Sequence, residues 1–333
     1  MNTFGRIFKV SIFGESHGKA VGVLVDGCPA GIELNEKDFS DDLKRRKGGG
    51  YGKTERIEED RPIILSGVFN GRTTGAPIMV IFENKNVRPA DYEALKNLPR
   101  PGHADFVAFK KYGGFNDYRG GGHFSGRLTV GLVGAGVIAK KVTTPLRYRA
   151  EVMEVGGSSE MGKPIREAKQ NGDSVGGIVE CVIENVPAGL GEPFFDSVES
   201  LLSHIVFSIP GIKGIEFGAG FMAARMRGSE YNDEIIDIAG RTATNNAGGI
   251  NGGITNGNSV VFRVAVRPTA SILKKQKTIN LETGKEEEIS VKGRHDVCIA
   301  LRFPVILEAV SAIVFADLML IEQRVARVFR KGV

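Results

Sequence analysis

Three glycines interrupt an otherwise apolar, helix-forming stretch in the middle of the chain. They are Gly131, Gly134 and Gly136, and the pattern predicts a helix over residues 125–142. Glycine inside a helix costs roughly 1 kcal/mol relative to alanine. Such a concentration of glycine indicates that other backbone approaches this helix closely, so we expect it to be central to the fold.

A second long apolar segment lies near the C-terminal end. Residues 304–329 are predicted to form a helix with Pro304 in its first turn. The apolar run 303–321 contains Glu308 and Asp317. These acids make it a poor membrane span and a better core helix, and we expect both to be buried carboxylates with partners.

Strands and helices alternate along the rest of the chain. Strands are expected at residues 7–13, 21–26, 63–69, 77–83, 148–155, 177–185, 214–218 and 260–266. Helices are expected at residues 36–46, with Asn35 as the cap, and at 104–112 and 195–208. The alternation predicts a mixed α+β fold with room for two similar halves. We see no linker composition and expect a single domain over residues 1–333.

Composition sets the class of protein. A hydrophobic content of 41% and a charged content of 25% are typical of a soluble globular chain. Cys28, Cys181 and Cys298 lie far apart, which suits a reduced cytosolic protein. Arg6 and Lys9 interrupt the first apolar stretch, so we expect no signal peptide and a cytoplasmic location. The net charge of +5 is compatible with nucleic acid or with acidic small substrates.

Four of the five histidines lie in short segments rich in Gly, Arg and Pro rather than in apolar runs. These are His17, His103, His123 and His295, in segments 14–18, 100–105, 119–127 and 293–296. Such segments form loops, where binding and catalysis concentrate. Histidine changes charge near neutral pH, and arginine suits phosphate and carboxylate. We therefore predict a site that moves protons beside an anion, whereas His204 is interpreted as a structural core or edge residue.

Each motif also has a plainer interpretation. His17 could belong to a solvated turn, and the basic run 44–47 suits the C-terminal turn of a helix as well as an anion clamp. The glycines at 120–122 form a generic anion cradle, neither a P-loop nor a dinucleotide fingerprint. Segment 294–296 could be a loop ion pair worth under about 1 kcal/mol. No cluster indicates a metal site, and neither Ser16 nor Ser125 lies in a nucleophile elbow.

Taken together and in this order, the segments resemble the chorismate synthase family. The resemblance runs from Phe4 to about Phe329 and includes residues 186–193 and 247–250. It implies conversion of 5-enolpyruvylshikimate 3-phosphate to chorismate and phosphate by an anti-1,4-elimination. It further implies a requirement for reduced FMN without net redox change, a homotetramer, and a β-α-β sandwich core.

The resemblance also implies catalytic roles for five residues. His17 would protonate the departing phosphate, and His103 would protonate or balance the reduced flavin near N1. Asp296, with Ser16 and Ser125, would assist proton transfer around flavin N5.

Binding roles follow from the same resemblance. Arg46 and Arg127 would hold substrate anions, with Arg45 a neighbour, and Arg46 would contact NADP if NADPH reduces the flavin. The implied FMN contacts are His123, Phe124, Ser125, Gly211, Gly252, Arg267, Pro268, Thr269, Ala270, Ser271 and Arg294.

Two other classes of function stay open at this point. A nucleic-acid-binding module would need aromatic side chains interleaved with a basic face, and this chain has no Trp and separated basic clusters. A nucleotide-dependent phosphotransferase is disfavoured because the P-loop pattern is missing. We therefore expect neither nucleic acid nor membrane as a partner.

Overall fold

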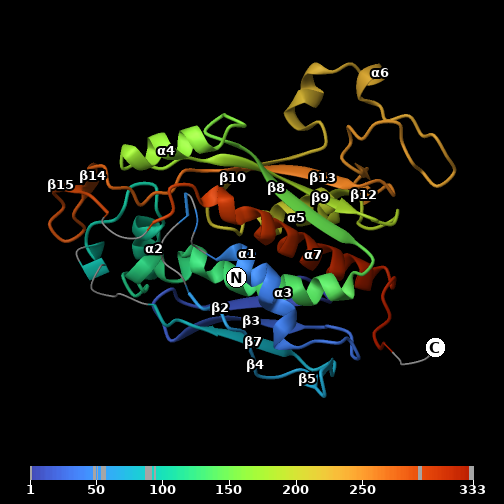
Figure 1. Cartoon of the computed structure of the whole chain (residues 1–333), viewed down its shortest axis with the longest axis horizontal. Coiled ribbons are helices and arrows are strands. Elements are labelled where there is room, and N and C mark those ends of the chain that lie inside the picture. Colours follow the sequence, from blue (N-terminus) through green and yellow to red (C-terminus); the bar gives the residue numbers. More distant parts are fainter. Residues whose placement is uncertain are drawn as a thin grey trace.

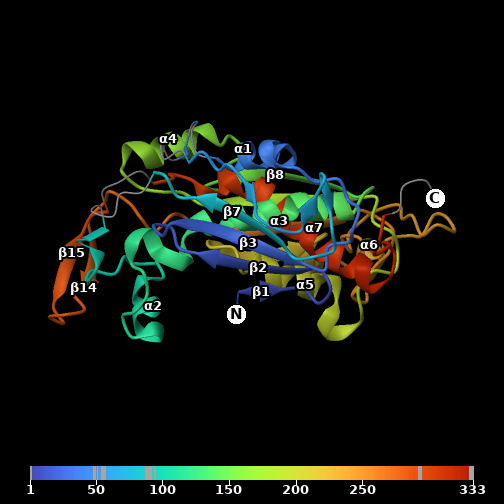
Figure 2. The same cartoon turned by 90° about the horizontal axis from the view of Figure 1, so that it is seen from below.

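Two antiparallel sheets enclose a pair of helices (Figure 1). The first sheet has the order β1 (Thr3–Phe4), β2 (Lys9–Gly14), β3 (Ala20–Asp26), β7 (Ile78–Glu83) and β4 (Ile63–Ile64). The second has the order β10 (Ile212–Phe217), β13 (Val260–Val266), β9 (Gly177–Glu184) and β8 (Arg147–Val155). Helices α3 (Thr129–Val142) and α7 (Phe303–Ile321) lie between the sheets. Figure 2 views the molecule from below, where the first sheet lies in front of these helices. The predicted mixed α+β class is confirmed.

The structure is a computed structural model that describes residues 2–47, 50, 52–53, 58–86, 92–93, 95–291 and 295–329. The other α-helices are α1 (Ser40–Arg46), α2 (Asp105–Tyr112), α4 (Gly162–Gln170), α5 (Val198–Val206) and α6 (Gly228–Tyr231). Short 3-10 turns include η1 (Glu36–Phe39), η3 (Arg119–Phe124), η4 (Gly126–Leu128), η5 (Phe194–Asp196), η6 (Gly220–Arg225) and η7 (Ile299–Arg302). Three small hairpins are β5 (Val68–Phe69) with β6 (Arg72–Thr73), β11 (Ile250–Asn251) with β12 (Ile254–Thr255), and β14 (Gln276–Ile279) with β15 (Glu286–Ile289).

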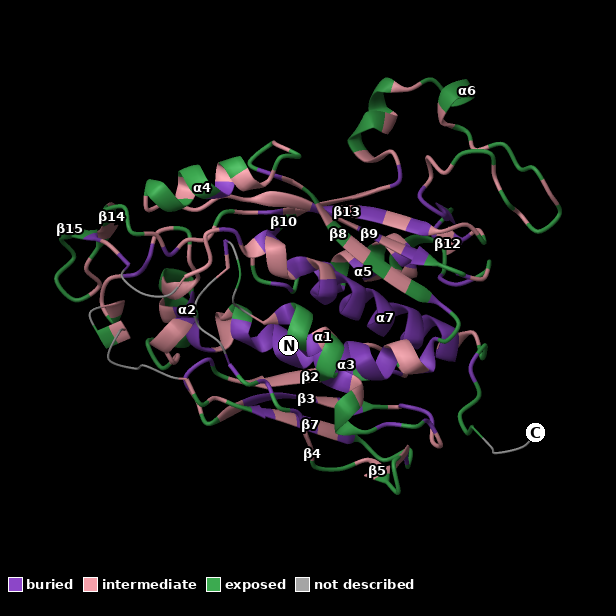
Figure 3. Ribbon diagram, viewed as in Figure 1, coloured by how far each residue is buried: buried purple, intermediate pink, exposed green. Residues whose placement is uncertain are grey.

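Each sheet turns one face toward the helix layer because its strands alternate. In β7, Ile78, Val80 and Phe82 are buried while the residues between them are not. Strand β13 repeats this pattern along its length. Side chains from both sheets and both helices form one contiguous hydrophobic cluster, and Figure 3 shows α3 and α7 almost wholly buried. The two similar halves and the single-domain boundary stay predictions.

The three glycines of α3 face close neighbours, as the sequence predicted. A Cβ added at Gly131 would lie 3.0 Å from the carbonyl oxygen of Gly22 on β3. At Gly136 it would lie 2.3 Å from the Cβ of Ala309 on α7. The first contact would be unusually tight and the second is too short for any real Cβ, so glycine allows α3 to touch a strand on one side and a helix on the other.

The two carboxylates of α7 are buried and partnered, which confirms the expectation for both. Glu308 accepts hydrogen bonds from Arg45 at 2.6 and 2.7 Å and from Lys140 at 3.1 Å. Asp317 accepts from three successive backbone N–H groups of residues 6–8 at 2.7–2.8 Å. The span Ile299–Ile321 is long and apolar enough to cross a membrane, yet 89% of its most apolar window is buried inside the protein.

Several predicted boundaries differ from the structure. The helix expected over residues 304–329 ends at Ile321, where Gln323 takes a left-handed conformation and the chain turns away. The strand expected at 63–69 is divided into β4 and β5, because Gly67 lies at φ +78° against Pro77 and Ile78. The sequence pattern did not reveal α4 or the hairpin β14–β15.

Replacing Gly136 with alanine should destabilise the protein. The added methyl group collides with Ala309, and overpacking of this kind costs about 1–3 kcal/mol even though alanine favours helix. Denaturant unfolding measures the change. Gly228→Ala in α6 is the control, because its Cβ would meet nothing closer than 3.9 Å. Equal stabilities of the two variants would contradict the close contact of α3 and α7.

Candidate active site

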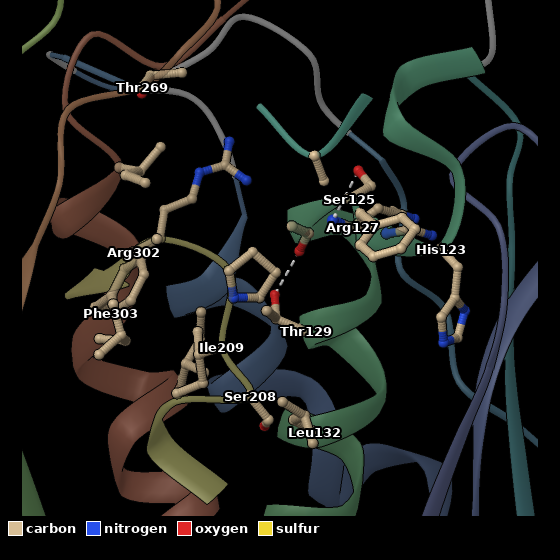
Figure 4. A pocket seen from close by; sticks show the side chains of 18 of the residues that line it. His123, Ser125, Arg127, Thr129, Leu132, Ser208, Ile209, Thr269, Arg302 and Phe303 are labelled. Atoms are coloured by element: carbon tan, nitrogen blue, oxygen red, sulfur yellow. Dashed lines mark hydrogen bonds between the residues drawn. The ribbon is translucent and has the colours of Figure 1, made fainter. Parts of the chain in front are cut away.

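A cavity of about 890 Å³ lies where the first turns of α3 and α7 meet the segment that follows α5. Figure 4 shows Arg127 and Thr129 on one side, Arg302 and Phe303 on the other, and Ile209 between them. Segments that are remote in sequence therefore share one space. A cavity of this size suits small-molecule ligands, whose sites span about 300–1,000 Å³.

Most of the predicted site residues line this cavity. They are Arg46, His103, His123, Phe124, Ser125, Arg127, Gly211, Arg267, Thr269, Ala270, Ser271 and Asp296. Pro268 is not a lining residue, although both of its neighbours are. Arg294 lies outside the described residues. His204, expected in the core or at an edge, is exposed and lines the cavity, with its ring 5.4 Å from that of Phe4.

His17 and His103 both lie against the glycine run 120–122. All three glycines have positive φ values. A Cβ at Gly120 would lie 2.4 Å from the imidazole of His17, and a Cβ at Gly121 would lie 2.9 Å from that of His103. His17 is buried with its ring 4.9 Å from that of Tyr92, and both Tyr92 and Gly120 line the cavity. His17 therefore lies directly behind the wall.

Ser16 and His123 are held by the backbone of neighbouring segments. Ser16 is buried beside His17, and its N–H donates to the carbonyl of Gly122 at 3.1 Å. Nδ1 of His123 donates to the carbonyl of Gly14 at 2.8 Å. Figure 4 shows the imidazole of His123 directed away from Arg302. These contacts join the loop after β2 to η3.

Two predicted binding residues lie away from the cavity. Arg45 points from α1 to Glu308 and Asp42, so it belongs to an ion-pair network of the fold and does not line the cavity. Gly252 lies in the turn between β11 and β12 and does not line the cavity. The binding roles predicted for these two residues stay predictions.

His103 belongs to a network that fixes its ring. Its Nδ1–H donates to Asp105 at 2.6 Å, and in the neutral ring this leaves Nε2 able to accept a proton. Asp105 also pairs with Arg100, which donates to Ser271 at 3.0 Å. Burial lowers the pKa of His103 below its ordinary value, the bond to Asp105 opposes this, and the charge of Arg100 reinforces it.

Arginine–carboxylate pairs supply much of the remaining charge in the cavity. Asp60 bridges Arg46 and Arg127, and Nε of Arg302 donates to Asp296 at 3.0 Å. Burial lowers the pKa of Arg302, although Asp296 opposes the shift.

The sequence analysis missed Asp60 and Arg302 as site residues. Nothing local marks Asp60, since its partners lie 14 and 67 residues away. Arg302 did carry a signal, because a cation at the N-cap of α7 faces the positive end of the helix dipole. A charge placed against that dipole points to a partner or an anion nearby.

The cavity could hold a flat, partly apolar ligand that bears negative groups. Apolar side chains of Phe124, Ile209, Ile299 and Phe303 line it together with the guanidinium groups. Oγ1 of Thr269 is buried there and has no hydrogen-bond partner among the described residues, so a ligand acceptor or donor could satisfy it. Within the described part of the chain, no three His, Cys, Asp or Glu side chains are grouped to hold a metal ion.

Known proteins are similar to this chain along nearly its whole length. The family model for chorismate synthase matches residues 8–320. A chorismate synthase from Chitinophaga pinensis is 64% identical over 331 residues, which covers 99% of this chain and 100% of the relative. The chain belongs to the chorismate synthase family. A chorismate synthase from Pyrococcus abyssi is 47% identical over 344 residues, which covers 95% of this chain and 97% of that relative.

The fold of the family is also shared. A crystal structure of a chorismate synthase has a TM-score of 0.72 to this chain at 28% identity and covers 96% of this chain and 93% of that one. The protein is thus an enzyme of the chorismate synthase type, a lyase of the shikimate pathway that serves aromatic biosynthesis.

Replacing Asp105 with asparagine should lower the pKa of His103 further. The wild-type pKa already lies below its ordinary value, and the bond to Asp105 that raises it is weakened while the charge of Arg100 remains. An NMR titration of the His103 ring measures this. Asp173→Asn, which removes an exposed partner of Lys274, serves as the control. A pKa that rises in the Asp105 variant would contradict the assignment.

Proposed function

We propose that this chain converts 5-enolpyruvylshikimate 3-phosphate to chorismate and inorganic phosphate by an anti-1,4-elimination that requires reduced FMN without net redox change. The bond from carbon to the phosphate oxygen breaks, a ring proton leaves, and a new double bond forms. The supporting observation is the single cavity that brings His103 and Asp296 together with three arginines, Arg46, Arg127 and Arg302.

The charge of the cavity fits the substrate. The substrate carries one phosphate and two carboxylates, and guanidinium groups bind both kinds of anion through paired donors. Arg46 and Arg127 are proposed to hold these anions, and Arg302 is a further candidate because its Nη2 is buried with no hydrogen-bond partner in the described part of the chain. Arg45 is left out because Glu308 already holds it.

The cavity also fits reduced FMN. Phe124, Ser125, Gly211 and the segment 267–271, apart from Pro268, line it, and the buried hydroxyl of Thr269 offers a polar contact. Arg267 is a candidate for the cofactor phosphate, although burial lowers its pKa. When bound, the cofactor would supply the electron density that eases phosphate loss.

The protein's own groups are proposed to move the protons. His17 protonates the departing phosphate, and the bare backbone of Gly120 leaves no side chain between its imidazole and the cavity wall. The neutral ring of His103 exchanges a proton at Nε2, because Nδ1 is bound to Asp105. The carboxylate of Asp296, together with Ser16 and Ser125, assists the transfer of the ring proton.

The single variants His17→Ala and His103→Ala should each lower turnover by roughly 10²–10⁴-fold, because a positioned acid or base usually contributes that much. The assay is anaerobic, with photoreduced FMN, the phosphorylated enolpyruvyl substrate and measured phosphate release. Asp173→Asn is the control for handling and folding. Wild-type activity without any reduced flavin would refute the mechanism, and near-normal turnover in both histidine variants would refute their roles.

The source of electrons and the assembly form the rest of the proposal. NADPH, contacted by Arg46, is one candidate reductant, and substituting it for light in the same assay tests this.

We further propose a cytoplasmic homotetramer. The segment between β10 and β11 (residues 218–249), which includes α6 and is called the arm below, projects from the second sheet (Figures 1 and 3). It carries five exposed apolar residues, Phe221, Met222, Ile235, Ile236 and Ile238. Exposed apolar patches of this kind mark interaction surfaces.

The double change Ile235→Asp and Ile238→Asp should break the tetramer into smaller species, because charged groups oppose burial at an interface. Light scattering during size-exclusion chromatography gives the mass, with the wild type expected at four chains. Leu65→Asp, an exposed apolar residue beside β4, is the control. A variant that stays at four chains would exclude the arm from the interface.

A further inference from the structure

Asp60 lies between two guanidinium groups in the wall of the cavity. Its side chain has 0% exposed surface, and one oxygen accepts a hydrogen bond from Nη2 of Arg46 at 2.7 Å while the other accepts from Nη1 of Arg127. Burial by itself would raise the pKa of Asp60, but the charges of Arg46 and Arg127 outweigh it and hold the pKa below its ordinary value. A permanent negative charge therefore lies in a cavity whose proposed substrate is also negative.

The other contacts of the two arginines are unequal. Arg127 donates from Nε to Asn84 at 2.9 Å and from Nη2 to a backbone carbonyl at 3.3 Å. Arg46 has one further contact, from Nη1 to Thr129 at 3.3 Å, and its buried Nε has no hydrogen-bond partner in the ranges that the structure describes. Arg127 is thus fixed by three acceptors, whereas Arg46 depends mainly on the bridging carboxylate.

A carboxylate at this point works against anion affinity. Its charge cancels one of the two positive charges, and it occupies a donor on each guanidinium group. A site arranged for affinity alone would be better without it. What Asp60 does supply is geometry, because one rigid bridge sets the spacing and orientation of both forks.

We propose that Asp60 is a positioning residue of the substrate site, which holds Arg46 and Arg127 in one arrangement so that the bound anion takes a single reactive pose. The inference rests on the proposed function, in which these two arginines hold anions of the substrate. Asp60 lowers the affinity of the free site for anions and raises the rate of the reaction.

Asp60→Asn should therefore separate binding from turnover. The amide has the same shape but no charge and one acceptor fewer, so the site with one freed guanidinium donor should bind inorganic phosphate about fivefold more tightly or better. Turnover should fall by about 10–100-fold, because a misplacement near 1 Å can reduce a rate that much. A merely structural role would weaken phosphate binding and turnover together.

The experiment measures phosphate binding by calorimetry, the thermal shift produced by phosphate, and turnover in the anaerobic assay. Asp60→Glu keeps the charge and should show wild-type phosphate affinity with partly restored turnover. Glu308→Gln is the matched control, since Glu308 is a buried carboxylate paired with Arg45 and Lys140 outside the cavity. It should lower stability and leave phosphate affinity unchanged.

The results separate this inference from the proposed function. A wild-type protein that forms no chorismate refutes the function, while phosphate affinity still tests Asp60. If Asp60→Asn is too unstable for turnover measurements, its thermal shift with phosphate should still exceed that of the wild type. Phosphate binding in Asp60→Asn that is equal to or weaker than wild type overturns the proposal, as does tighter binding in Asp60→Glu.

Discussion

The close contact of α3 with α7 is the constraint on which the rest of the structure depends. Gly136 faces Ala309 about two turns into each helix, and the first turns of both helices line the same cavity, so the helices run in the same direction. A side chain at Gly136 would force them apart. Because each helix also packs on a sheet, the contact sets the spacing of the whole sandwich. It also brings two positive helix ends to one place, which is where the cavity lies.

That convergence creates an electrostatic problem that acidic residues solve. Two helix N-termini and several arginines would repel one another, and most of the arginines have a carboxylate partner from a separate segment. Asp60 serves Arg46 and Arg127, Asp105 serves Arg100, and Asp296 serves Arg302. Buried charges are stable when they are paired and hydrogen-bonded. Each pair also fixes the direction of its guanidinium group, so the cations are oriented before any ligand arrives.

The sequence predicted those parts of the molecule that local pattern controls. The glycines of α3, the alternating strand β13 and the capped helix after Asn35 were all found, because periodicity and caps act over a few residues. The site was predicted only in part. Arg45 and Arg46 are adjacent in a basic run, but successive residues on a helix point about 100° apart, so one meets Glu308 and the other the cavity. Asp60 could not be found, since both of its partners are remote in sequence.

The structure shows a further reason why residues 120–122 are all glycine, beyond the one that the sequence suggested. The expected reason was an anion cradle, whose backbone N–H groups face a ligand. The structure shows in addition that space is the constraint: Gly120 leaves room for the imidazole of His17, and Gly121 leaves room for that of His103. A side chain at either position would displace a histidine, and the positive φ values would strain it as well. One short turn therefore sets the separation of the two imidazoles, which neither histidine motif could fix alone.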